Sequence, residues 1–554
     1  DEYENPAERQ EQEFLMLRDP VTNKIPHNIW QREREYAMTL PSIDIANMDN
    51  SNLTERGPTN RGGRTRALGV DVRSTSLAAT TIIAGGVSGG IFKSVNNGTT
   101  WTNTFGSTQL RNVTCLTQDF RVGKEDTWYA GSGERFGNSA SASGASFLGD
   151  GIYKTTNNGN NWALLPSTTN STPQSFTSEF NFVYNVVIDP STNTEDIVYA
   201  AACDVITKSS DGGTTWNTVI GNLADNSATD VLVTSRGIVF ATFSSLNGDT
   251  AKGIYRSGDK GATWTKINPS FMPSNYTRLV LASYPNPNQV RTTGIPVDTN
   301  TRKALIYVFG QTPGSGKIGD TGDANEWVSL WKYNDSTHVW TDLSANLPTA
   351  AAPVQGLNTQ GSYNLKVAVG SRDSNLITVG ATNLYRSTNG FTTLVGASNW
   401  IGGYATANNV SQYSNHHPDN HSFVFHPLSD SLAYSGHDGG VSHTANMYNT
   451  TGGATPVVWS ELNNGYNVTQ FYSVGIAPEA GSNLIVGGAQ DNGTQVFNAV
   501  GYPFWQTSPE GGDGTFAVVA PVADYTMYYA TQNGRIRSWQ RDMNFIELFT
   551  PGAN

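Results

Sequence analysis

A stretch of twelve residues recurs along the first half of the chain and constrains the fold more than any other feature. Each copy joins a short strand to a turn of Asn or Asp with Gly, and a Trp follows the turn. The variation is largely confined to polar positions, which indicates architecture rather than a repeated catalytic site. The clear copies are "GIFKSVNNGTTW" at 90–101, "GIYKTTNNGNNW" at 151–162, "VITKSSDGGTTW" at 205–216 and "GIYRSGDKGATW" at 253–264.

Weaker copies follow towards the end of the sequence and bring the total to about nine units, spaced roughly fifty residues apart. About four short strands per unit at this period predict a β-propeller. No unit shows the 3.6-residue apolar period of a helical solenoid, so we expect an all-β fold. We also expect the Trp residues of the clear copies to be buried at equivalent positions: Trp101, Trp162, Trp216 and Trp264.

The unit count predicts how the chain divides into domains. Residues 1–56 contain two short amphipathic patterns and predict a helical N-terminal extension. Nine units exceed the usual four to eight blades of one propeller. We therefore expect about seven blades within 57–460, and two further blades within 461–554 that start a second propeller. The alternative is a single nine- or ten-bladed propeller over 57–554, in which the last unit would pair with the first.

Composition excludes several classes of function. The net charge is −12 and no run of Lys or Arg occurs, which argues against a nucleic-acid partner. No apolar stretch approaches the roughly 20 residues of a membrane span. The sequence favours free buried thiols at Cys115 and Cys203 over a disulfide. The first residues lack a signal-peptide pattern, which fits a cytosolic protein or a mature chain, and the few Lys and many aromatics favour the extracellular alternative.

The repeat has a family resemblance. The spacing of Ser209, Asp211, Gly213, Thr215 and Trp216 resembles the Asp box (BNR repeat) of sialidases, xyloglucanase-like glycoside hydrolases and sortilin-type propellers. The resemblance implies a structural turn between the third and fourth strands of a blade, on the face away from the ligand site. The unrepeated segments "YAGSGE", "HPDNH", "SGHDGG", "GGAQDNGT" and "EGGDG" resemble large secreted Asp-box proteins of the glycosyl-hydrolase-like or sortilin-like kind. The N-terminal "NPAERQEQEFLMLRDPVTNKIPHNIWQREREYA" followed by "RGPTNRGGRTRAL" resembles the mature start of such proteins exported by the type IX route of Bacteroidota, which implies an extracellular or cell-surface location.

None of the known activities of these families can be assigned directly to this chain from its motifs. The R-I-P motif of sialidases is absent from the sequence. Xyloglucanase-like enzymes carry a catalytic Asp in a D-V-G-G loop of their first blade, where this chain reads "GGVSGG" at 85–90. The chemistry must therefore be sought in the chain's own unrepeated loops.

Those loops carry carboxylates on the face expected to oppose the repeated turns. Asp438, Asp491 and Asp513 lie beside glycines in three consecutive units. Acid/base chemistry on a glycosidic bond needs paired carboxylates, so these three are the candidate catalytic residues. The alternative for each is an ordinary Asp-Gly turn. The candidate ligand-binding residues in neighbouring loops are Glu134, Arg64, Gln490 and Tyr466.

Histidines are concentrated in one segment, since six of the eight lie between 416 and 443. His417, Asp419 and His421 alternate and would share one face of an extended strand. This donor set suits a divalent metal ion, which is the one cofactor that the residues suggest without requiring it. The alternative is a hydrogen-bonded network of imidazoles and carboxylates that stiffens the loop, in which carboxylate pairing would favour acid pH.

Two hypotheses for function follow from these residues. The first is a secreted or cell-surface propeller that recognises extracellular glycan and hydrolyses it through Asp438, Asp491 and Asp513. The rival is a non-enzymatic scaffold that binds a surface protein in a bacterial surface assembly. The sequence leaves open whether the chain is an enzyme.

Overall fold

The structure, a computed structural model, describes most of the chain from residue 57 to residue 539, with parts of the segments on either side. Residues 1–10 and 40–56 of the expected N-terminal extension lie outside the described residues. The described ranges are 11, 14–15, 17–27, 29–39, 57–106, 109–137, 146–169, 176–222, 228–244, 251–285, 304–348, 356–405, 412–451, 455–478, 482, 484–497, 506–507, 512–521, 526–539 and 545–549.

The described residues are nearly all β and form nine antiparallel sheets. Eight sheets have four strands in simple sequential order, and one has five. Side chains alternate across each strand, so both faces of a sheet can pack against neighbouring sheets. The expected all-β architecture of four-stranded units, consistent with a β-propeller, is confirmed.

Seven of these sheets lie between residues 65 and 461. Their strands are β1–β4 (Thr65–Val70, Ile82–Gly86, Ile91–Ser94, Thr102–Asn103), β5–β8 (Val113–Gln118, Trp128–Ser132, Ile152–Thr155, Ala163–Leu164), β9–β12 (Val183–Ile188, Val198–Ala202, Val205–Ser209, Asn217–Gly221), β13–β16 (Thr229–Val233, Val239–Phe243, Gly253–Ser257, Thr265–Lys266), β17–β21 (Leu279–Tyr284, Leu305–Gln311, Lys317–Ile318, Trp327–Asn334, Val339–Asp342), β22–β25 (Lys366–Val369, Ile377–Gly380, Leu384–Ser387, Trp400–Gly402) and β26–β29 (Asn420–His426, Ser429–His437, Gly440–Thr444, Trp459–Glu461).

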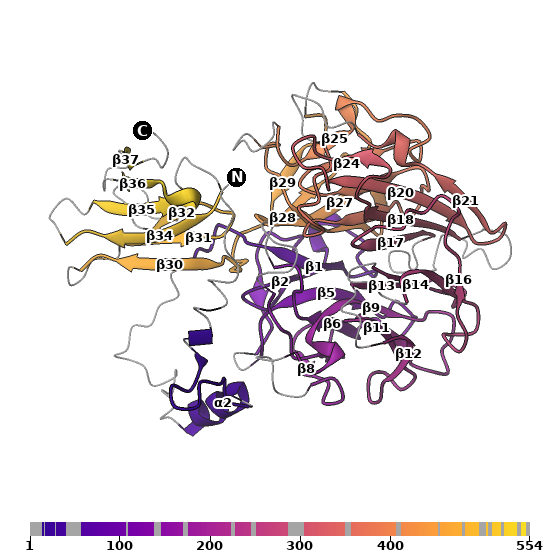
Figure 1. Cartoon of the computed structure of the whole chain (residues 1–554), viewed down its shortest axis with the longest axis horizontal. Helices are drawn as coiled ribbons and strands as arrows, with labels where there is room; N and C mark the ends of the chain where they lie inside the picture. The colour runs from indigo at the N-terminus through magenta and orange to yellow at the C-terminus, as the bar shows by residue number, and fades with distance from the viewer. Residues whose placement is uncertain are drawn as a thin grey trace.

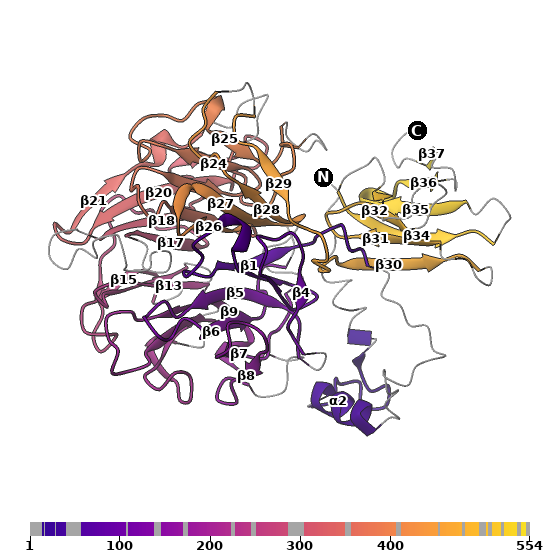
Figure 2. The same ribbon diagram turned by 180° about the vertical axis from the view of Figure 1, so that it is seen from behind.

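Two more sheets follow in the chain, and one helix precedes all of them. The strands are β30–β33 (Phe471–Ile476, Ile485–Ala489, Thr494–Phe497, Gln506–Thr507) and β34–β37 (Gly514–Val519, Met527–Thr531, Ile536–Trp539, Phe545–Phe549), and the helix is α2 (Ile29–Thr39). In both ribbon views α2 lies outside the sheets (Figure 1, Figure 2). Within the described residues, no helix is long and apolar enough to cross a membrane.

The first strands of the seven sheets contact one another in a closed cycle. The contacts run β1–β5–β9–β13–β17–β22–β26, and β26 returns to β1. A buried cluster at this junction combines Ile82 and Ala84 of the first sheet with Tyr434 and Val441 of the seventh. The sheets of β30 and β34 contact each other and lie to one side of the ring (Figure 1).

The repeated turns join the third and fourth strands of their sheets and share one hydrogen-bond pattern. In each, a hydroxyl accepts the backbone N–H of the residue four positions later, and the Asn or Asp two positions on bonds to the same hydroxyl. The hydroxyl to N–H pairs are Ser94–Gly98 (2.8 Å), Thr155–Gly159 (3.2 Å), Ser209–Gly213 (2.8 Å) and Ser257–Gly261 (2.8 Å). These glycines have φ between +74° and +98°, so a turn of this shape favours glycine there.

The four repeated Trp side chains are buried to different extents. Trp101 and Trp162 are buried at 8% and 6% exposure. Trp216 and Trp264 are half-buried and pack against the edges of two other core clusters. The expectation that these side chains are largely buried is therefore met, most fully by Trp101 and Trp162, and all four belong to the packing between sheets.

Residues 461–469, here called the closing segment, run from the seventh sheet across the first. Leu462 O accepts from Trp101 Nε1 (2.6 Å), and Val468 O accepts from Ser88 Oγ (2.9 Å). The Tyr466 ring is fully buried and lies 5.2 Å from Phe92 and 5.1 Å from Trp101 between ring centroids. The closing segment thus fastens the last sheet of the ring to the first.

Candidate functional site

The strand order brings the unrepeated loops to one end of the ring. In a sequential antiparallel sheet, the loop entering the first strand and the loop between the second and third strands share an end. Arg64, Tyr363 and Asp419 lie in entering loops, and Glu134 and Asp438 lie in second-to-third loops. The third-to-fourth turns of the repeat therefore lie at the opposite end.

Asp438 is the centre of a buried hydrogen-bond network. The Tyr363 hydroxyl donates to Asp438 Oδ2 (2.6 Å), and His421 Nε2 lies 2.7 Å from Oδ1. Arg64 Nη1 in turn donates to the Tyr363 hydroxyl (2.8 Å). Asp438 is only 1% exposed. Because a carboxylate accepts hydrogen bonds, this arrangement fixes the protonated nitrogen of neutral His421 at Nε2.

Glu134 lies beside this network and is bound by two arginines. Arg64 Nη2 donates to Glu134 Oε2 (3.0 Å), and Arg66 Nε donates to Oε1. Arg66 also donates to the backbone oxygen of Phe136 (2.7 Å), which holds the loop across the end of the ring. Both oxygens of Glu134 are occupied, so its role here is to neutralise two buried cations.

Asp491 belongs to the neighbouring two-sheet unit but reaches the same network. Its side-chain oxygen lies 4.0 Å from Arg64 Nη1, and its carbonyl oxygen accepts from His417 Nε2 (2.9 Å). Its backbone N–H donates to Asp513 Oδ1 (2.7 Å). The Asp491 side chain is 25% exposed. The structure thus brings the three predicted Asp residues into one site, with Asp491 at its accessible side.

The environments of these carboxyls push their pKa values apart. Burial alone would raise the pKa of Asp438, but His421, Arg64 and Tyr363 outweigh burial and hold it well below its usual range. Burial raises the pKa of Asp491, and the charges of Asp513 and Asp438 raise it further. Groups whose pKa values diverge in one site are candidates for separate acid and base roles.

The suggested metal ligands do not converge on a common point. His421 is bonded to Asp438, and Asp419 Oδ1 accepts from Asn364 Nδ2 (2.7 Å). Both ring nitrogens of His417 face backbone carbonyl oxygens. Among the described residues, no group of three His, Cys, Asp or Glu side chains is arranged to hold a metal ion. The geometry is that of a hydrogen-bonded network.

The predicted preference of this network for acid pH is wrong in direction. Burial lowers the pKa of His416 to about 3 and the pKa values of His421 and His443 to about 4. The rings are held neutral because burial dominates, and at His421 it outweighs the contact with Asp438. Protonation therefore disfavours the folded state.

Two predicted ligand-binding residues differ in their placement from the expectation. Tyr466 belongs to the closing segment, and its hydroxyl bonds to Thr65 Oγ1 (3.1 Å), so it packs in the core and cannot line a ligand site. Gln490 precedes Asp491 and is 8% exposed.

Cys115 and Cys203 are free and buried, and burial raises each thiol pKa to about 12.

Sequence reasoning missed two tyrosines of the site. Tyr363 follows a turn in which Gln360 and Ser362 adopt positive φ, and this strained backbone gives no clear sequence pattern. Tyr404 is half-buried, and the charges of Asp419, Asp491, Asp438 and Asp513 all raise its pKa after burial itself. It is thus an aromatic side chain that lies beside the whole carboxylate group.

Comparisons with known proteins show the fold. No protein-family model matches the chain. A xyloglucanase of Paenibacillus sp. is 28% identical over 235 residues, which are 37% of this chain and 20% of that protein, so the match spans a fifth of the relative's length.

Solved structures of GH74 enzymes superpose on most of the chain. The enzyme of Niastella koreensis covers 90% of this chain and 68% of its own, with a TM-score of 0.57 and 15% identity. The xyloglucanase of Xanthomonas campestris covers 90% and 74%, with a TM-score of 0.53 and 14% identity. An ancestral GH74 enzyme covers 90% and 64%, with a TM-score of 0.55 and 16% identity. The chain therefore has a β-propeller fold similar to that of these glycoside hydrolases.

Proposed function

We propose that this protein is an extracellular or cell-surface β-propeller that binds glycan and hydrolyses it at the Asp491 site. The observation that carries the proposal is the pair of opposite pKa shifts on Asp438 and Asp491 within one coupled group of carboxyls. The similarity to a xyloglucanase makes xyloglucan the first substrate to test.

Asp491 is the proposed proton donor. Its raised pKa keeps it protonated closer to neutral pH, and its partly exposed side chain can approach a glycosidic oxygen. Asp513 is the proposed partner carboxylate, since it makes the largest charge contribution to the Asp491 pKa. Asp438 is buried and fully bonded, so its proposed role is to position Arg64 and Tyr363 beside Asp491. Tyr404 supplies an aromatic surface for a sugar ring.

The alternative is a non-enzymatic scaffold that binds a surface protein. The observation that favours it is the complete internal bonding of Glu134 and Asp438, which leaves neither carboxylate available to a substrate. The two hypotheses differ in whether Asp491 and Asp513 perform chemistry.

Hydrolysis of soluble xyloglucan and related β-glucans, followed by reducing-end release, distinguishes them. We expect Asp491→Asn to lower kcat by about 10²–10⁴ while glycan binding persists, as for loss of a general acid. Glu461→Gln is the matched control, because Glu461 is exposed on β29 and lies outside the site. Glycan binding without hydrolysis by the unmodified protein would favour a binding module, and no binding to any glycan would favour the scaffold.

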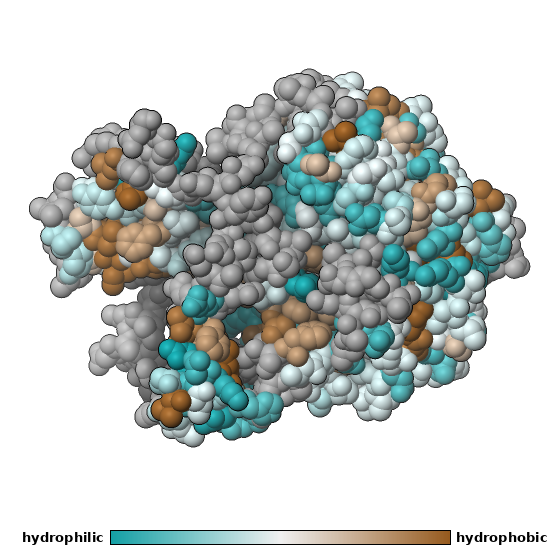
Figure 3. Space-filling model, in the orientation of Figure 1, coloured by the Kyte–Doolittle hydropathy of each residue, from teal (hydrophilic) through white to brown (hydrophobic). Residues whose placement is uncertain are grey.

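We also propose the domain division and the origin of the repeat. Residues 57–460 would form a seven-bladed propeller and residues 461–554 the first two blades of a second, with the repeated turns acting as Asp boxes. Exposed apolar side chains on β30 and β34, Val474, Ile476, Phe516 and Val518, support further packing against these sheets (Figure 3). Export by the type IX route is part of the same proposal and rests on the sequence resemblance alone.

A further inference from the structure

A cavity of about 130 Å³ lies on the axis of the ring, below the loop that carries Glu134 and Phe136. Residues of all seven first strands, or of the positions directly beside them, line it. Phe136 lines the cavity and is buried in one cluster with Tyr363, at 4% and 1% exposure. A second cavity of about 180 Å³ adjoins it and is lined mainly by apolar residues.

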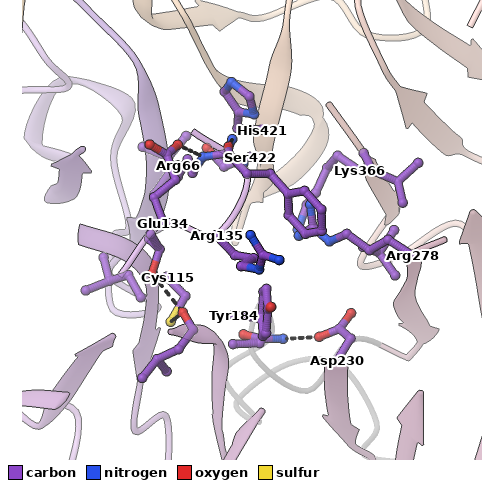
Figure 4. Close-up of a pocket in the computed structure, with 18 of the residues that line it drawn as sticks. Arg66, Cys115, Glu134, Arg135, Tyr184, Asp230, Arg278, Lys366, His421 and Ser422 are labelled. Carbon is purple, nitrogen blue, oxygen red and sulfur yellow. Dashed lines mark hydrogen bonds and ion pairs between the residues drawn. The ribbon is translucent and has the colours of Figure 1, made fainter. Parts of the chain in front are cut away.

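The wall of the first cavity carries four cationic side chains, Arg66, Arg135, Arg278 and Lys366. Figure 4 shows the Arg135 guanidinium near the middle of the space, with Arg278 and Lys366 on one side and Arg66 with Glu134 on the other. Two carboxylates share this wall, Glu134 and Asp230. The balance of charge therefore depends on what these two carboxylates bind.

Both carboxylates are bonded to other groups. Glu134 is occupied by Arg64 and Arg66. Asp230 accepts from Asn185 Nδ2 (2.9 Å) and from the backbone N–H groups of Val231 and Leu281 (both 2.8 Å). A dashed line at Asp230 in Figure 4 marks one of these hydrogen bonds. In the part of the chain that the structure describes, no carboxylate forms an ion pair with Arg135, Arg278 or Lys366.

Neighbouring groups only weakly compensate the positive charges of the three remaining cations. Arg278 donates one bond of 3.3 Å to Ser362 O and lies 5.6 Å from the Phe136 ring centroid, while its buried Nε has no hydrogen-bond partner. Arg135 lies 5.8 Å from the Phe182 ring centroid. Burial and then the charge of Arg66 lower the pKa of Arg278 to about 10. Burial also lowers the pKa of Lys366, and Asp230 only partly opposes this.

We propose that this axial cavity is a binding site for a small oxyanion of the phosphate or sulfate class, held by Arg135, Arg278 and Lys366. Three weakly compensated cations around one small space favour a compact ligand with more than one negative charge. Guanidinium groups suit the several acceptor oxygens of such an ion, and Lys366 adds a point charge. The inference is independent of the proposed glycosidase activity, because among the described residues Arg135, Arg278 and Lys366 form no ion pair with Asp438, Asp491 or Asp513.

The proposed route to the cavity is the adjoining second cavity. The two cavities share seven lining residues, among them Lys366, Leu281 and Phe423. A small hydrated ion can pass where a polysaccharide cannot. The ligand is therefore expected to stabilise the ring rather than to take part in glycan chemistry.

Binding of inorganic phosphate and of sulfate by the full chain tests the proposal, with calorimetry and the thermal midpoint Tm as readouts at matched ionic strength. We expect saturable one-to-one binding and a rise in Tm. Lys366→Met and Arg278→Gln should each weaken binding about ten-fold or more, as expected for loss of one charge-assisted contact. Lys332→Gln is the matched control, because Lys332 is also half-buried but lies on β20, outside the cavity lining.

A second measurement separates a binding role from a structural one. In chloride buffer without oxyanion, Lys366→Met removes an uncompensated charge and should raise Tm. In saturating phosphate the unmodified chain should instead have the higher Tm, because only the unmodified chain is stabilised by bound ligand. Absence of saturable binding, or unchanged binding by both cavity variants, would overturn the proposal. Tighter binding of acetate or succinate than of phosphate would overturn the assigned class of ion.

Discussion

Glu134 shows how a single buried carboxylate can organise one end of the ring. It is 2% exposed, and its two oxygens bind different arginines that come from the loop entering β1 and from β1 itself. Arg64 then reaches Tyr363, and Tyr363 reaches Asp438. A carboxylate that appeared in the sequence as a candidate ligand-binding group is thus the counter-ion on which the neighbouring side chains depend.

Replacement of this carboxylate tests that role. Glu134→Gln leaves two buried arginines without their counter-ion, and loss of one partner of a buried ion pair costs about 3–5 kcal/mol. We expect the free energy of unfolding in urea to fall by that amount. Glu461→Gln, at an exposed position, should change it by no more than about 0.5 kcal/mol. Equal stability of the two variants would show that Glu134 does not compensate the arginines.

At the scale of elements, the strands β26–β28 and their loops combine buried imidazoles with few charged partners. His426 Nε2 lies 2.9 Å from Thr80 Oγ1, and His437 Nε2 lies 2.9 Å from Ser442 Oγ. The His416 ring lies 4.6 Å from the Trp459 ring centroid, and neither of its nitrogens has a hydrogen-bond partner. These contacts suit neutral rings, because hydroxyl and aromatic neighbours do not stabilise an imidazolium as a carboxylate does.

The buried histidines make stability depend on pH. Their folded pKa values lie near 3–4 or lower, against 6.5 in the unfolded chain, so the unfolded state binds more protons between these limits. Their contribution is complete above pH 6.5 and is lost as pH falls towards 4. Four carboxyls oppose this trend, since their raised pKa values favour protonation in the folded state: Asp230, Glu326, Asp419 and Asp491.

Five histidines outnumber these four carboxyls, so we expect the free energy of unfolding to decrease between pH 6.5 and 4.5. Urea unfolding at a series of pH values measures it. His426→Asn removes one imidazole outside the carboxylate site and should flatten the curve. A free energy of unfolding that rises over this interval would mean that the carboxyls dominate, or that the histidines are paired as the sequence first suggested.

At the scale of the whole molecule, the repeat predicted the all-β architecture because its turn chemistry is local. The Ser or Thr, the Asn or Asp and the Gly of each turn bond within five residues, so their spacing is visible in sequence. The site was only partly predictable. Asp438, Asp491 and Asp513 could be grouped because their loops lie at the same end of three consecutive sheets. The Arg64–Tyr363 bond, by contrast, joins residues 299 positions apart. Only the closure of the ring brings such residues together.

The closing segment determines at which residue the chain can be truncated without destabilising the ring. The expected boundary at residue 460 falls before Tyr466, which fills the space between Phe92 and Trp101, and before Val468, whose carbonyl binds Ser88. We expect a chain of residues 57–470 to unfold cooperatively, whereas residues 57–460 should lose several kcal/mol of stability, since burial of one large aromatic side chain alone contributes about 3–5 kcal/mol. Thermal and urea unfolding followed by circular dichroism compares the two, and Tyr466→Ala in the longer chain should reproduce most of the loss. If the two truncated chains were equally stable, the first and seventh sheets would have to close through β1 and β26 alone, and the closing segment would be a linker to the next two sheets.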